Sequence, residues 1–94
     1  CVIEPPEATN APGTRHDFGV WVSATDGSPA AGETIVVEIV SGPHAGATGS
    51  GVSDDDGYAG FNYTGVADRT GRDVIRASGG TAGGAFACTA TKYW

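Results

Sequence analysis

The chain has 94 residues, of which 39% are hydrophobic and 17% are charged, and its formal net charge at neutral pH is −6. This length fits one domain with a single core. The excess of acidic residues argues against a nucleic-acid partner, because binding to phosphates depends on cationic side chains. No apolar run is long enough to span a membrane.

Turn residues interrupt the sequence at short intervals and predict a fold made of strands. Sixteen glycines and five prolines favour turns over helices. In the clearest unit, the turn Asp56-Gly57 leads into a strand that carries Phe61 and Tyr63 on one face. In chain order, the predicted strands are 2–4, 15–25, 33–40, 48–53, 58–64, 73–78 and 85–94, with loops at 7–14 and 79–84. The spacing predicts an all-β fold, a seven-stranded antiparallel immunoglobulin-like β-sandwich.

The alternation of side chains predicts which face of each strand lies inside. In strand 15–25, Val20 and its same-phase neighbours point inward, which places Trp21 on the outer face. In strand 33–40 the charged Glu38 must face out, and strand 48–53 is an edge strand because it is rich in glycine. The predicted inward residues of these and the following strands are Phe18, Val20, Val22, Ala24, Ile35, Val37, Ile39, Ala59, Phe61, Tyr63, Ile75 and Ala77.

The two cysteines lie at opposite ends of the chain. Cys1 starts the first predicted strand and Cys88 lies in the last. These strands can lie side by side in an immunoglobulin-like sandwich, so a structural disulfide is predicted, worth up to about 4.5 kcal/mol. The alternatives are two free thiols or a lipid-modified Cys1. A disulfide implies an oxidising compartment, and hence an extracellular, secreted or cell-surface location.

Several segments resemble bacterial immunoglobulin-like domains, the repeats found in the invasin and intimin adhesins and in many secreted multidomain proteins. The matching segments are 10–16, 22–32, 41–46, 56–63, 71–77 and the final Trp94. The resemblance covers nearly the whole chain, and the cysteine pair is not a usual part of the pattern. It implies a rigid extracellular module, arranged in tandem with neighbouring domains of the same polypeptide.

The first residues of the sequence also favour a module of a larger protein. The sequence opens at Cys1 with no methionine and no signal-like segment. We therefore expect residues 1–94 to be a single bacterial immunoglobulin-like domain, a fragment of a larger multidomain protein or a processed product.

No pattern in the sequence predicts catalysis or a cofactor. Nucleophilic catalysis needs a serine or cysteine beside a base and an orienting acid. The two histidines, His16 and His44, have no serine and carboxylate placed around them by the sequence, and His16 is expected to cap the loop that precedes its strand. The protein is predicted not to be an enzyme.

Two weaker signals concern ligands. Asp54, Asp55 and Asp56 share a loop that lies at the same end of a sandwich as Asp26, and clustered carboxylates can hold calcium. A solvated turn is the favoured interpretation, because adjacent aspartates point in different directions.

Trp21 gives the second signal. Strands 15–25 and 58–64 are neighbours in this fold, so Trp21 is expected near Tyr58, Gly60 or Asn62, where an aromatic ring can stack on a sugar. The sequence thus predicts a rigid structural or adhesion module. Its alternatives are a module that binds a carbohydrate or host receptor through Trp21 and Tyr58, and an accessory domain of a secreted hydrolase.

Overall fold

The computed structural model describes residues 1–24, 26–81 and 84–94, and these residues form eight strands and no helix. The strands are β1 (Val2–Glu4), β2 (Glu7–Thr9), β3 (Arg15–Trp21), β4 (Thr34–Ser41), β5 (Thr48–Val52), β6 (Tyr58–Thr64), β7 (Arg72–Thr81) and β8 (Gly84–Tyr93). Within these ranges there is accordingly no apolar helix that could cross a membrane.

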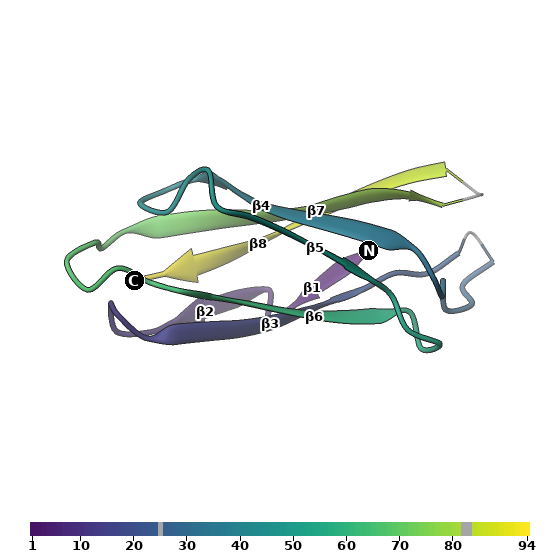
Figure 1. The fold of residues 1–94 in the computed structure, drawn as a ribbon, viewed down its shortest axis with the longest axis horizontal. Helices are drawn as coiled ribbons and strands as arrows, with labels where there is room; N and C mark the ends of the chain where they lie inside the picture. Colours follow the sequence, from purple (N-terminus) through teal and green to yellow (C-terminus); the bar gives the residue numbers. More distant parts are fainter. Residues whose placement is uncertain (25, 82–83) are drawn as a thin grey trace.

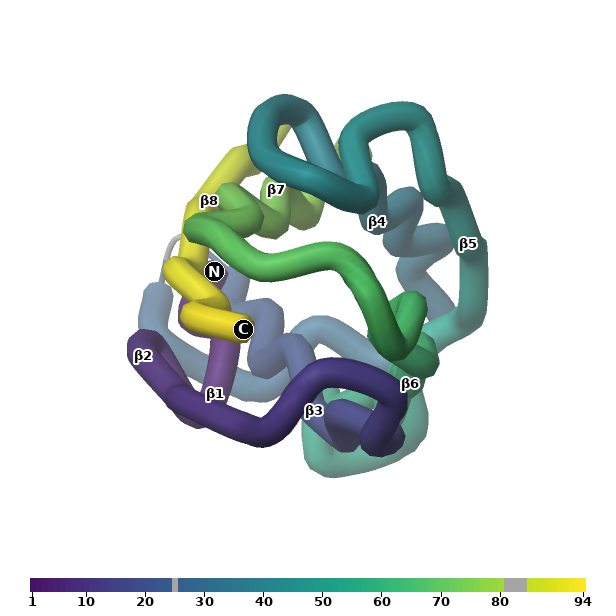
Figure 2. The backbone as a smooth tube through the Cα atoms, turned by 90° about the vertical axis from the view of Figure 1, so that its left-hand side faces the viewer, coloured from purple at the N-terminus to yellow at the C-terminus, as the bar shows by residue number. Residues whose placement is uncertain are grey.

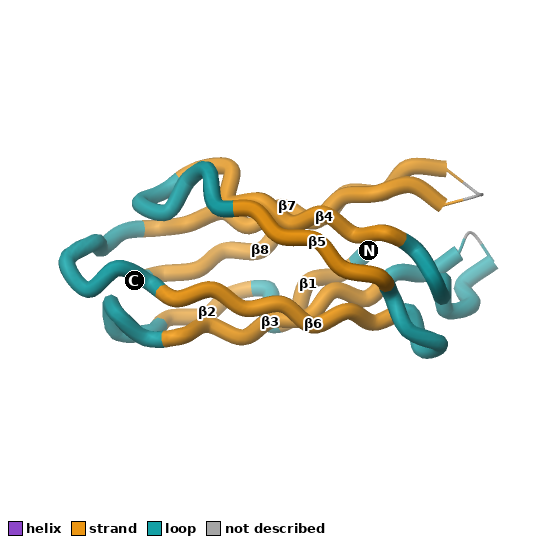
Figure 3. The backbone as a smooth tube through the Cα atoms, viewed as in Figure 1, coloured by secondary structure: helices purple, strands orange, loops and turns teal. Residues whose placement is uncertain are grey.

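Two sheets face each other as a sandwich. The smaller has the strand order β1-β3-β6 and the larger has the order β2-β8-β7-β4-β5. Figure 1 shows the two layers from the side and Figure 2 shows them along the long axis. The domain measures 43 × 19 × 18 Å, and most of its loops lie at the two ends of the long axis (Figure 3).

The expectation of seven antiparallel strands was wrong in one respect, because part of the predicted loop 7–14 is a strand. Pro5 and Pro6 follow β1 and have no N–H group to continue its ladder. The chain therefore leaves the smaller sheet after β1 and joins the larger one as β2, which runs parallel to β8. All other strand pairs in the described ranges are antiparallel.

The hairpin of β7 and β8 is longer than predicted. Gly79 and Gly80, expected in a loop, continue the ladder opposite Phe86 and Ala85. A side chain at Gly79 would come within 2.6 Å of the Phe86 ring, so the glycine makes room for that ring and does not mark a turn. The rest of the predicted loop includes residues 82–83, which lie outside the described residues.

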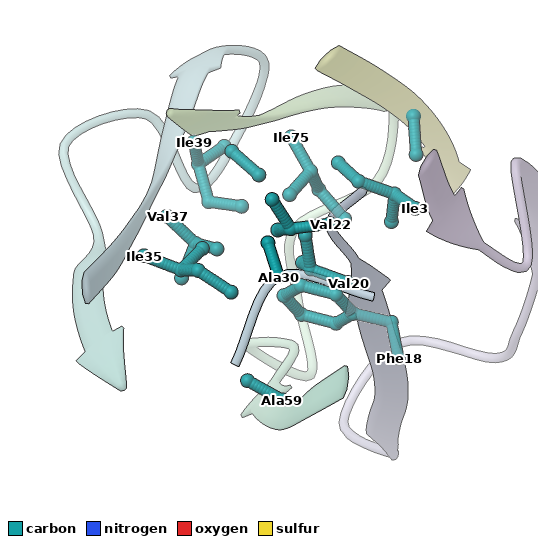
Figure 4. Packing of buried hydrophobic residues seen from close by; sticks show 12 residues of the cluster. Ile3, Phe18, Val20, Val22, Ala30, Ile35, Val37, Ile39, Ala59 and Ile75 are labelled. Atoms are coloured by element: carbon teal, nitrogen blue, oxygen red, sulfur yellow. The ribbon is translucent and has the colours of Figure 1, made fainter. Parts of the chain in front are cut away.

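The core lies between the sheets, and most of the predicted phases are confirmed (Figure 4). Val20 and Ile35 are fully buried, whereas Trp21 is 41% exposed on the outer face. Phe61 is only half-buried, because the facing edge strand β5 offers Gly51 in place of a side chain to cover the ring. The buried apolar residues are Ile3, Phe18, Val20, Val22, Ala30, Ile35, Val37, Ile39, Ala59, Ile75, Ala77 and Ala90.

Candidate functional site

The predicted disulfide is present between Cys1 and Cys88. Cys1 immediately precedes β1 and Cys88 lies within β8, with Cα atoms 5.7 Å apart. The two strands belong to different sheets, so the bond crosses the sandwich. It closes a loop with a sequence separation of 87, which is nearly the entire chain.

A groove lies on the outer face of the smaller sheet, and we call it the Tyr58 groove. Its aromatic lining residues are Tyr58, Phe18 and Phe61. Trp21 of β3 lies beside the groove, outside this lining, opposite Tyr58 of β6, with ring centroids 4.7 Å apart and planes inclined by 52°. This arrangement agrees with the expectation that Trp21 lies beside Tyr58.

Glycine forms the floor of the Tyr58 groove. The next cross-strand pair on this face is Gly19 and Gly60. The Tyr58 ring lies over Gly19 so closely that any side chain there would overlap it. A Cβ added at Gly60 would instead be 3.6 Å from the Tyr58 hydroxyl, an ordinary contact. The ring covers Gly19 and leaves room above Gly60.

Polar side chains surround the floor. The groove encloses about 320 Å³, and its polar lining comes from Glu4, Arg15, Asp17 and Asn62. Arg15 is already paired with Asp17 at 2.8 Å, and both side chains are exposed. The groove thus combines an aromatic wall with two carboxylates and an amide.

A second cluster lies inside the domain around the fully buried Asp73, and we call it the Asp73 cluster. The Asp73 carboxylate accepts four hydrogen bonds. Its Oδ1 accepts the backbone N–H of His44 at 3.1 Å. Its Oδ2 accepts His44 Nδ1–H at 2.7 Å, the Tyr63 hydroxyl at 2.9 Å and the Trp94 indole N–H at 2.9 Å. The carboxylate therefore joins β6, β7, the chain end and the loop after β4.

The His44–Asp73 pair resembles part of a catalytic triad in chemistry, but its other bonds assign it a structural role. His44 Nε2 accepts the backbone N–H of Val66 at 2.9 Å, so the ring proton is on Nδ1. Both ring nitrogens are engaged and the side chain is buried. A general base needs a free nitrogen facing its nucleophile. His44 therefore connects two loops of the fold.

Sequence reasoning missed the Asp73 cluster. The Tyr63 side chain, expected as an inward-facing residue, donates its hydroxyl to the Asp73 carboxylate. Burial, together with the Asp73 charge, raises the pKa of Tyr63 far above its usual range. The alternation of side chains along this strand could have identified Asp73 as a buried residue, because Asp73 shares the inward phase of Ile75 and Ala77.

Two further basic side chains, Lys92 and His16, are buried beside the Asp73 cluster. Lys92 is fully buried, directly opposite Asp73 on β8, and its Nζ lies 4.8 Å from the Trp94 ring centroid. Within the described ranges, Nζ has no hydrogen-bond partner. Burial lowers the pKa of Lys92. Burial and the Lys92 charge, in that order, lower the pKa of His16 below 6.5.

We expect Lys92→Met to stabilise the domain by about 1–2 kcal/mol, because it removes a buried amine that has no hydrogen bond. It should also raise the pKa of His16. Since the neutral His16 ring is the form favoured in the fold, stability is lost as pH falls below 6.5 and through the folded pKa. Because the folded pKa of His16 would move closer to 6.5, the variant should lose stability over a narrower pH range. Urea denaturation and NMR titration of His16 measure the two effects.

The matched control is Arg76→Met, an exposed cation of β7, which should change neither quantity appreciably. A less stable Lys92→Met protein would contradict the prediction, because it would mean that the ammonium over Trp94 stabilises the fold.

Two of the aspartates considered for calcium, Asp54 and Asp26, accept hydrogen bonds from residues of their own turns. Asp54 Oδ1 accepts the backbone N–H groups of Asp56 and Tyr58, and Asp26 Oδ1 accepts the backbone N–H and the hydroxyl of Ser28. Asp55 and Asp56 are exposed. No group of three or more His, Cys, Asp or Glu side chains suited to a metal occurs among residues 1–24, 26–81 and 84–94.

Comparison with known proteins gives no relative: no family model, no curated protein and no solved structure matches this chain.

Proposed function

We propose that this domain is a non-enzymatic, immunoglobulin-like structural module of an extracellular protein, of the kind repeated in bacterial surface adhesins. The disulfide between Cys1 and Cys88 carries the proposal. Bridges of this kind persist in oxidising environments, which include secreted proteins and cell surfaces. This bridge also joins the two sheets of the sandwich.

The strand arrangement supports the immunoglobulin-like assignment. The N-terminal segment divides between the two sheets at Pro5 and Pro6. After it, β3 and β6 lie in the smaller sheet, and the hairpins β4-β5 and β7-β8 lie in the larger one. The domain is more than twice as long as it is wide. Its C-terminus lies near one end and its N-terminus lies in the other half (Figure 1). A neighbouring domain attached at each terminus would therefore extend the chain along this axis.

A spacer must resist extension, and the bridge provides this property. Force applied at the two termini passes through Cys1 and Cys88 along the disulfide, because only residues 89–94 lie outside the closed loop. The fold inside the loop is shielded from the load. Pulling on single molecules by their ends tests the proposal: the oxidised domain should release almost no length, and the reduced domain should release most of its chain.

A further inference from the structure

Beyond this structural role, we propose that the Tyr58 groove is a binding site for a pyranose sugar that carries no acidic group. The outer faces of sheets in a spacer need only be soluble. Here the outer face of β3 and β6 carries a hollow of about 320 Å³ with an aromatic wall and a polar lining. Sites for small ligands combine such an apolar surface with a few convergent polar groups.

The aromatic wall fits the apolar face of a sugar ring. The hydroxyl end of the Tyr58 ring lies against Gly19, and the side chain is partly exposed. Trp21, 41% exposed and 4.7 Å away, continues the aromatic surface. Aromatic rings with one free side provide a large contact area at low conformational entropy cost.

The polar lining fits the hydroxyl groups of the same sugar. Asp17 and Asn62 are a cross-strand pair next to the glycine floor, and Glu4 is opposite Gly19 on β1. Carboxylates accept hydrogen bonds from hydroxyls, and an amide both donates and accepts. These groups stand beside the aromatic wall, so a ring stacked on Tyr58 would present its edge to them.

The charges of the groove select among sugars. Glu4 and Asp17 supply two carboxylates, whereas the one cation, Arg15, is held by Asp17 at 2.8 Å. The whole chain has a net charge of −6. Uronic, sialic and sulfated sugars would be repelled, whereas neutral sugars and cationic amino sugars would not.

A protein partner fits this surface less well. Protein interfaces usually have an apolar core inside a polar rim and bury about 800 Å² on each side. Here the glycine floor is narrow, and carboxylates lie beside it. Tyr58 also covers a strand glycine, which by itself stabilises a sheet. That packing explains why the ring lies over Gly19, but it does not require glycine at position 60, where a Cβ would make only ordinary contacts with Tyr58.

Gly60→Val provides the sharpest test. Because a Cβ at Gly60 makes only ordinary contacts, the backbone there accepts a side chain, and a β-branched residue favours a strand. Valine then fills the floor, and the dispersion of the NMR spectrum checks that the variant is folded. The probes are cellohexaose as the neutral oligomer, hexaglucosamine as the amino oligomer and oligogalacturonate as the acidic one. NMR would follow the Trp21 indole and the Gly19 and Gly60 amides. The Trp94 indole, bonded to Asp73, is the internal reference.

We expect the neutral or the amino oligomer to shift the Trp21, Gly19 and Gly60 signals while the Trp94 signal stays in place. Gly60→Val and Trp21→Ala should each weaken this binding at least about tenfold, as loss of an anchor residue does. The control Tyr93→Ala, which removes a 37% exposed aromatic from the other sheet, should leave it unchanged.

Three results would overturn the inference. The first is no shift of the groove signals with either the neutral or the amino oligomer at millimolar concentration. The second is binding that persists in a folded Gly60→Val protein, which would place the ligand elsewhere. The third is equal binding of oligogalacturonate, which would contradict the role of Glu4 and Asp17.

Discussion

Asp73→Ala is expected to cost about 3–5 kcal/mol of unfolding free energy, a large part of the stability of a domain this size. The carboxylate accepts four hydrogen bonds, and its removal leaves the donors of His44 and Tyr63 without this acceptor. The Trp94 indole N–H would keep only its longer bond to the Tyr63 hydroxyl at 3.3 Å. Each unsatisfied buried donor costs about 1–3 kcal/mol. Urea denaturation gives the free energy, and Trp94 fluorescence reports the local change.

Two variants make this prediction specific. Asp73→Asn keeps the shape and one acceptor oxygen, so its cost should lie between those of the wild type and the alanine variant. Asp17→Ala removes an exposed carboxylate paired with Arg15 and should cost no more than about 1 kcal/mol. If Asp73→Ala and Asp17→Ala cost the same, the Asp73 cluster does not stabilise the fold as described.

Reduction of the Cys1–Cys88 bond should lower the unfolding free energy by about 2–5 kcal/mol. The bond restrains a loop with a sequence separation of 87 in the unfolded chain, and long loops lose the most entropy on closure. The same loss is expected for the double variant Cys1→Ser/Cys88→Ser without reductant. Thermal unfolding of the oxidised, reduced and double-serine proteins measures it.

The double-serine protein is the control for side effects of the reductant, because it should not respond to reductant at all. Alkylation of the native, unreduced protein provides a direct check. Two reactive thiols would show that the bridge does not form, and a reduced protein as stable as the oxidised one would show that it contributes nothing.

Strand phases could be read from the sequence because one face of each strand packs in the core. Ile35, Val37 and Ile39 alternate with exposed residues, and the structure buries all three. The same rule placed Trp21 outside beside Tyr58. The Tyr58 groove itself was not evident, because its depth depends on how the Tyr58 ring lies over Gly19, and that depends on the register between β3 and β6.

Two features could not be found by alternation alone. The short strand β2 has no apolar pattern, since its sequence is Glu-Ala-Thr; it is a strand because β8 offers a free edge after the chain turns at Pro5 and Pro6. The Asp73 cluster is polar, so hydrophobic periodicity does not reveal it. Its members, from His44 to Trp94, are brought together only by the packing of separate strands and loops.

The central claim is that the disulfide makes this domain an inextensible module. Single-molecule force spectroscopy through handles at residues 1 and 94 tests it most directly. The oxidised domain should show no unfolding step beyond the few residues after Cys88, whereas the reduced domain and the double-serine variant should each release roughly 300 Å of chain at about 3.5 Å per residue. An oxidised domain that releases the same length as the reduced one would contradict the proposed mechanical role.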